Sequence, residues 1–184
     1  MTPSTDKSNW QSLNLLQSDQ SNQFINNQKN PGPYSRCFYS AIQSELLVIL
    51  KENFSKQGRV YPEWALKLKL DEQDWFPVPA LTYVSYERLG KDWMLDEFCP
   101  IAPEFIVEIV EKGQQLDAIV AKVANYLKSG VLGVCLVNTY SHTVTISTNN
   151  HPPKTFTGEM IIENQFLSGL NLTATNLFKR AGFS

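Results

Sequence analysis

A strand from residue 105 to 110 is predicted by apolar side chains that occupy both of its faces, except at Glu108. Such a strand is typical of α/β proteins, in which helices cover the sheet on both sides. An unpaired carboxylate is costly to bury, so Glu108 is expected to have a partner or a chemical role. The pattern therefore predicts an α/β fold with one polar position in its central strand.

The segment that follows Gly113 predicts a helix that ends at Gly130. Its apolar residues recur at helical spacing and predict one buried stripe, made of Leu116, Ile119, Val120, Val123 and Leu127. Lys122 and Tyr126 lie one turn apart on the flank of this stripe, where a lysine can reach back over the strand. We interpret Tyr126 as a core residue at the helix flank rather than a catalytic phenol.

Further elements follow from the same periodicities. A helix is expected over 34–54, and it should end near Gln57 and Gly58. Strands over 64–70 and 78–85 are expected to form a hairpin, with Lys67 and Lys69 facing outward on the first. After the central helix, strands over 131–138 and 142–148 predict a second hairpin. A short strand over 159–163 and a short terminal helix are expected to close the domain.

Composition limits the domain organisation. The chain has 184 residues, of which 42% are hydrophobic, enough for one domain with a substantial core. Residues 1–33 are rich in Ser, Asn and Gln and predict an extended or disordered arm, and residues 34–184 predict the single domain. Three widely spaced cysteines suit a reduced cytoplasm, and no leader or membrane-spanning run is recognisable.

The formal net charge of −2 gives no general positive field that would favour nucleic acid. Contact with DNA would have to be local. Its candidates are Arg36, Lys51, Lys56, Arg59, Lys67, Lys69, Lys179 and Arg180. His142 and His151 have no partner at metal-ligand spacing and are interpreted as surface residues.

Several motifs together resemble a bacterial family of restriction endonuclease-like proteins within the PD-(D/E)XK superfamily. The matching residues are Pro79-Ala80, Pro103 to Ile109, Lys122, Tyr126, Gly130-Val131, the CLVN of 135–138, and Leu167 to Leu172. The resemblance covers roughly Tyr34 to Phe178. It implies a restriction endonuclease-like core, with a mixed central sheet flanked by helices, and a hydrolase that cuts DNA with Mg²⁺ or Mn²⁺.

The resemblance also implies roles for two residues. Glu108 would be the catalytic and metal-binding carboxylate, and Lys122 would stabilise charge on the phosphate or orient the nucleophile. In the wider superfamily the lysine follows the glutamate by two positions, which here is Val110. The lysine must therefore come from the helix, where this family places it.

The chain departs from the family pattern at the metal site. Ala80 stands where relatives have the metal-binding Asp, and Gln114 and Asn138 replace two further positions that are often acidic. One remaining carboxylate should bind a hard cation weakly, so we expect an impaired enzyme. The residues that could substitute as the second ligand are Glu45, Glu63 and Asp74.

The alternative is a non-catalytic protein. In that hypothesis Glu108 and Lys122 are only a buried salt bridge, and the same fold serves as a DNA-binding or protein-interaction module. In this hypothesis the protein could form a homodimer through an exposed sheet or helix face. Ala80 favours the non-catalytic hypothesis, and the presence of both Glu108 and Lys122 favours the enzymatic one.

Overall fold

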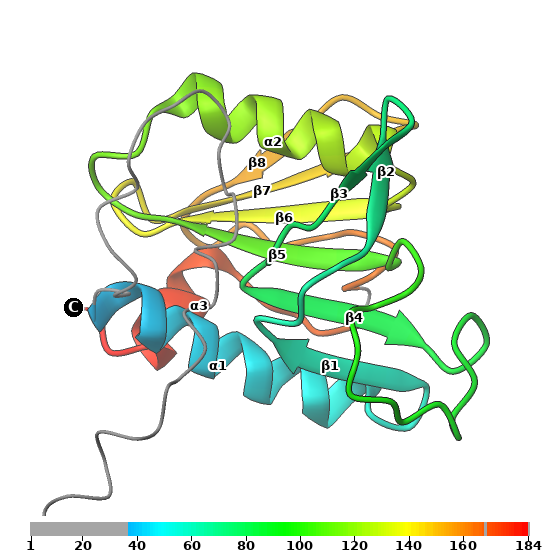
Figure 1. The fold of residues 1–184 in the computed structure, drawn as a ribbon. Coiled ribbons are helices and arrows are strands. Elements are labelled where there is room, and N and C mark those ends of the chain that lie inside the picture. Colours follow the sequence, from blue (N-terminus) through cyan, green and yellow to red (C-terminus); the bar gives the residue numbers. More distant parts are fainter. Residues whose placement is uncertain (1–36, 168, 184) are drawn as a thin grey trace, which may run out of the picture.

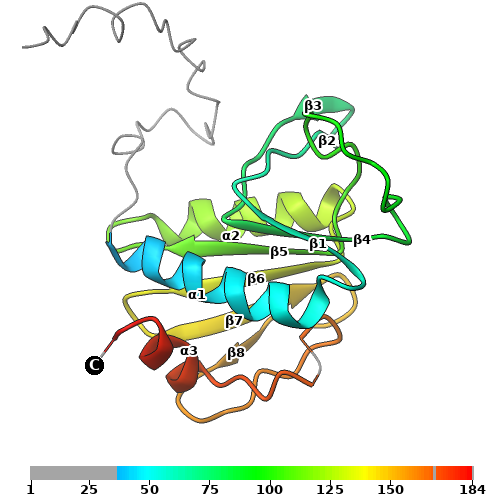
Figure 2. The same cartoon turned by 90° about the horizontal axis from the view of Figure 1, so that it is seen from below.

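A computed structural model of the protein describes residues 37–167 and 169–183. In this part of the chain a six-stranded sheet has helices on both faces, as Figures 1 and 2 show. The predicted arm of residues 1–33 lies outside the described residues. The predicted α/β class with a mixed central sheet and flanking helices is confirmed.

The helices are α1 (Cys37–Phe54), α2 (Leu116–Lys128) and α3 (Ala174–Arg180). The strands of the main sheet are β1 (Gly58–Pro62), β4 (Leu81–Ser85), β5 (Phe105–Val110), β6 (Gly133–Asn138), β7 (Thr143–Thr148) and β8 (Lys154–Phe156). They lie side by side in the order β1-β4-β5-β6-β7-β8. Among the strand pairs of this sheet in the described residues, β5 with β6 is the only parallel one, and α2 is the crossover between them.

The two faces of the sheet carry separate apolar clusters. Residues of α1 and α3 pack on one face against Phe105, Val107 and Ile109 of β5. Ile106 of β5 and Tyr126 of α2 belong to the cluster on the other face. Because side chains alternate along a strand, Glu108 shares the α2 face with Ile106. This alternation directs the carboxylate towards α2.

The predicted hairpin of 64–70 with 78–85 is wrong in its first strand. Pro62 ends β1, which pairs with β4. Of the alternating residues after it, Leu68–Leu70 form β2, which pairs with β3 (Gln73–Trp75) in a separate two-stranded ribbon. Both central residues of the ribbon turn, Asp71 and Glu72, have positive φ, as a tight hairpin turn requires. Lys128 of α2 forms an ion pair with Asp71 and so ties the ribbon to the helix.

The predicted stripe on α2 is also wrong in part. Leu116 and Val120 are 66% and 57% exposed, whereas Tyr126 is fully buried. Val123 and Leu127 pack at the edge of the same cluster. The helix buries the side that carries Tyr126, because this side packs against both the sheet and the ribbon.

The C-terminal part of the chain differs from the prediction in the position of its last strand. Lys154–Phe156 is the last strand of the sheet, and residues 159–163 contribute only an isolated bridge from Ile161 to Thr173. The predicted terminal helix is confirmed as α3. Thr173 caps it, since its hydroxyl accepts a hydrogen bond from the Asn176 amide at 3.0 Å.

Candidate active site

The carboxylate of Glu108 is held by two donors from α2. Lys122 Nζ lies 2.8 Å from Glu108 Oε1, and the hydroxyl of Tyr126 donates to the same oxygen at 2.7 Å. The side chains of Glu108 and Lys122 are only 15% and 21% exposed. The structure therefore brings together the two residues singled out in the sequence, in one strand-helix unit.

Tyr126 is buried between the sheet and the ribbon. Its ring lies 4.9 Å from that of Trp75 in β3. Burial raises the pKa of Tyr126 well above its usual value, and the negative charge of Glu108 adds to the effect. The phenol is therefore protonated at neutral pH and acts as a hydrogen-bond donor to Glu108.

Ala80 lies just before β4, and a second group of residues gathers around its carbonyl. The backbone amide of Glu63 donates to this carbonyl at 3.2 Å, and Gln43 Nε2 of α1 donates to it at 3.1 Å. Gln43 Nε2 also lies 3.4 Å from Glu63 Oε1. The side chain of Ala80 is 1% exposed and packs in the cluster on the α1 face.

The charges of both groups act on Tyr39. It lies one turn before Gln43 on α1 and packs at the edge of the core. Burial raises the pKa of the Tyr39 hydroxyl, and the negative charges of Glu108, Glu63 and Glu111 raise it further. Glu108 and Glu63 thus lie within electrostatic reach of one side chain.

The other substitutes named from the sequence have partners elsewhere. Glu45 forms an ion pair with Arg180 of α3 at 2.5 Å, and Asp74 forms one with Lys69 in the ribbon at 2.7 Å. Gln114 accepts a hydrogen bond from the Glu111 amide, and Asn138 accepts two from the turn that follows β6. His142 stacks on Phe178, with ring centroids 4.7 Å apart.

Metal-ligating residues are sparse in this region. Among the residues that the structure describes, no group of three or more His, Cys, Asp or Glu is arranged to hold a metal ion. Mg²⁺, however, is commonly bound by one or two carboxylates, with water and substrate phosphate oxygens completing the shell. A donor set of Glu108 and one further carboxylate fits such a weakly held cation.

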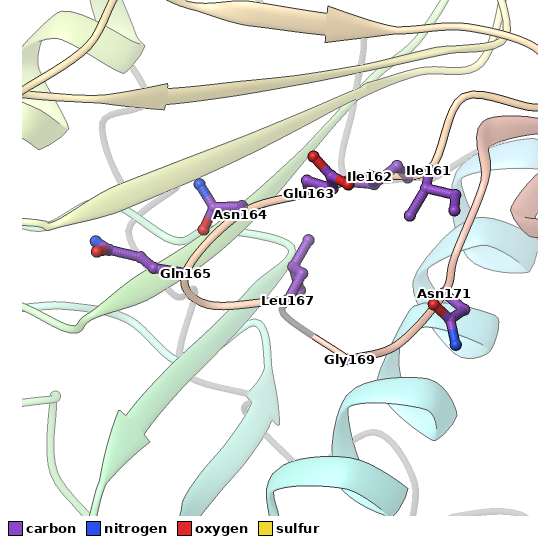
Figure 3. Close-up of a pocket in the computed structure, with 8 residues that line it drawn as sticks. All are labelled: Ile161, Ile162, Glu163, Asn164, Gln165, Leu167, Gly169 and Asn171. Carbon is purple, nitrogen blue, oxygen red and sulfur yellow. The ribbon is translucent and has the colours of Figure 1, made fainter.

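Two surface cavities lie outside the Glu108 cluster. The larger, of about 540 Å³, is lined by residues 161–165 and by Leu167, Gly169 and Asn171, and is shown in Figure 3. The smaller, of about 300 Å³, is lined by residues at the start of α1 and after β5 and β6. Neither Glu108 nor Lys122 lines either of these two cavities.

Tyr39 and Gln43 were not recognised from the sequence. A signal was present, because the two residues stand four apart beside the apolar positions Ile42 and Leu46 and thus share one helix flank. The spacing alone does not distinguish a flank that faces the site from one that is exposed to solvent, because both would show it. The sequence of α1 also does not indicate which end of the sheet the helix packs against.

The sequence model of one protein family, described as putative restriction endonucleases and named Uma2, matches residues 10–175. The chain belongs to the Uma2 family. No curated protein matches it. No helix within residues 37–167 and 169–183 is long and apolar enough to cross a membrane.

A solved structure supports the Uma2 fold. The crystal structure of a putative nuclease belonging to DUF820 from Anabaena variabilis ATCC 29413 is similar to this chain, with a TM-score of 0.71 and 21% sequence identity. The match covers 84% of this chain and 86% of that chain. At this identity the likeness shows the fold of the Uma2 domain. It is consistent with the nuclease-like core expected from the sequence.

Proposed function

We propose that this Uma2 protein is an endonuclease-type phosphodiesterase that acts on DNA with Mg²⁺ or Mn²⁺, and that its activity is impaired. The observation that carries the proposal is the 2.8 Å contact between Glu108 on β5 and Lys122 on α2. The sequence resemblance implies that these two residues do the chemistry. Their contact within one strand-helix unit is the arrangement that such a site needs.

Each residue has a distinct role in this proposal. Glu108 is a hard oxygen ligand for the cation, and Tyr126 fixes the position of its carboxylate through the 2.7 Å hydrogen bond. Lys122 is placed to stabilise negative charge on a phosphate that approaches the end of β5. A bound divalent cation would polarise the phosphoryl group and lower the pKa of the attacking water.

Ala80 explains why the activity should be low. Continuing the pairing of β4 with β5 by one residue beyond Leu81 and Val107 brings Ala80 opposite Glu108. The methyl group of Ala80 packs in the cluster on the α1 face, so we propose that a carboxylate here would reach the cation of Glu108 around the open end of the β4–β5 pairing. Alanine supplies no ligand, so the affinity for the cation should be low.

The test restores the missing carboxylate with Ala80→Asp. Supercoiled plasmid DNA is incubated with Mn²⁺ and the wild-type protein, Ala80→Asp, or Lys122→Met. We expect slow nicking by the wild type, at least tenfold faster nicking by Ala80→Asp, and none by Lys122→Met. Because position 80 is buried, circular dichroism must show that Ala80→Asp is folded. A folded variant with no gain in metal binding or cleavage would contradict the placement of residue 80 in the site.

The second candidate is a non-catalytic DNA-binding or protein-interaction module. It is favoured by Ala80 and by the exposure of Leu116 and Val120 on the outer side of α2, since exposed apolar side chains mark contact surfaces when they are grouped. A homodimer is one form of this candidate, and sedimentation velocity measures it directly. DNA binding without cleavage by the wild type and by Ala80→Asp would favour this candidate over the enzyme.

A further inference from the structure

We propose that Glu63 supplies the second carboxylate of the site, in place of the Asp that residue 80 lacks. This inference rests on the proposed function, because it names a ligand of the same metal site. It selects one residue among the three substitutes that the sequence left open. It also predicts that the site is altered rather than lost.

The first argument is the position of Glu63 in the sheet. Pro62 pairs with Leu81, and Leu81 pairs with Val107. If both pairings are continued by one residue, Glu63 comes opposite Ala80, and Ala80 comes opposite Glu108. The Glu63 amide does bond to the Ala80 carbonyl at 3.2 Å. Glu63 is thus the carboxylate-bearing neighbour of the position that has lost its carboxylate.

The second argument is the set of partners that Glu63 has. Within the described residues, its carboxylate accepts a long hydrogen bond from Gln43 Nε2, at 3.4 Å. By contrast, Glu45 and Asp74 each form an ion pair with a basic side chain. A cation would have to displace Arg180 or Lys69 from those carboxylates, in addition to competing with Lys122 at Glu108. At Glu63 it would compete only with a neutral amide.

The third argument is the backbone of Glu63. Its φ of 50° lies in the left-handed region that favours glycine. A residue with a side chain held there costs free energy, and such residues are concentrated at functional sites. This conformation follows directly on Pro62 at the end of β1. Glycine would fit the backbone better, so a glutamate at this position costs stability.

The experiment measures binding of Mn²⁺ alone, by isothermal titration calorimetry, to the full chain freed of metal with EDTA. The variants are Glu63→Gln and Glu108→Gln, and the matched control is Glu45→Gln on the neighbouring helix. We expect saturable binding by the wild type and by Glu45→Gln. Binding should be at least tenfold weaker in Glu63→Gln and absent in Glu108→Gln.

A fourth variant, Glu63→Gly, separates a ligand from a merely structural residue. It relieves the backbone strain and removes the carboxylate at once. We expect its melting temperature without metal to equal or exceed that of the wild type, and the increase in melting temperature caused by Mn²⁺ to be lost. A structural role alone would leave that increase unchanged.

The outcomes distinguish the inference from the proposed function. Wild-type affinity in Glu63→Gln, with binding lost in Glu108→Gln, would overturn the role of Glu63 and leave the metal site in place. No binding by the wild type would also overturn it. In that case, binding by Ala80→Asp that disappears when Glu108 is also replaced would uphold the family site. If Ala80→Asp also fails to bind Mn²⁺, both the role of Glu63 and the proposed metal site at Glu108 are wrong.

Discussion

Removing one partner of the Glu108–Lys122 pair should destabilise the domain even without metal. An exposed ion pair contributes about 0–1 kcal/mol, and breaking a fully buried pair costs about 3–5 kcal/mol. With side chains 15% and 21% exposed, this pair lies near the buried limit. Tyr126 still donates to Glu108 after Lys122→Met, which offsets part of the loss. We therefore expect Lys122→Met to reduce the free energy of unfolding by about 2–3 kcal/mol.

The measurement is a double-mutant cycle of Lys122→Met and Glu108→Gln in EDTA, followed by urea unfolding and tryptophan fluorescence. If the pair is coupled, the double variant should lose about 1–2 kcal/mol less than the sum of the single variants. In thermal melts, Lys122→Met alone should lower the midpoint by about 4–12 °C. Additivity within about 0.5 kcal/mol would refute the coupling. The contact would then be a surface pair of no structural weight.

Three further predictions concern stability. Gly58→Ala should lower the free energy of unfolding by about 1–3 kcal/mol, because the new Cβ would lie 2.5 Å from the carbonyl oxygen of Val84. Gly90→Ala, with open space around it, is the matched control and should change little in the same urea titration. Arg59→Met should lose about 2–3 kcal/mol and speed amide hydrogen exchange in the loop over 89–93, whose carbonyls accept hydrogen bonds from the buried guanidinium; unchanged exchange would contradict this role. The pKa of Tyr126 is raised by burial and by Glu108, so its contribution is complete below about pH 10 and is lost as the pH rises through the folded-state value. Urea titrations at pH 9, 10 and 11 should therefore show a shallower alkaline loss for Tyr126→Phe than for the wild type, and equal slopes would argue against it.

The central part of the fold could be predicted because its pattern is unambiguous. Phe105–Val110 is apolar on both faces, and the structure places it between β4 and β6 with helices on either side. The ribbon was missed because the alternation after Trp64 fits one strand as well as it fits a turn and a ribbon. Pro62 carried the missing signal, since proline removes a backbone donor and is typical of strand ends.

At the candidate site, the contact of Glu108 with Lys122 could be predicted, and the rest of the geometry only in part. The pairing of Glu108 with Lys122 followed from the strand and the helix together. The group around Ala80 depends on how α1 lies on the sheet, which no local pattern fixes. Gln43 therefore became recognisable only once its hydrogen bond to the Ala80 carbonyl was known.

The contact between Trp75 and Tyr126 gives this protein a built-in optical probe. The indole lies against a phenol whose hydroxyl is bonded to Glu108, so emission from Trp75 should respond when that carboxylate changes partners. Trp64 and Trp93 lie against each other, with ring centroids 5.6 Å apart. Replacing these two and Trp10, the fourth tryptophan of the sequence, by Phe would leave Trp75 as the emitter. Fluorescence from the ribbon could then follow events at the carboxylate in real time, with no dye attached and no substrate known.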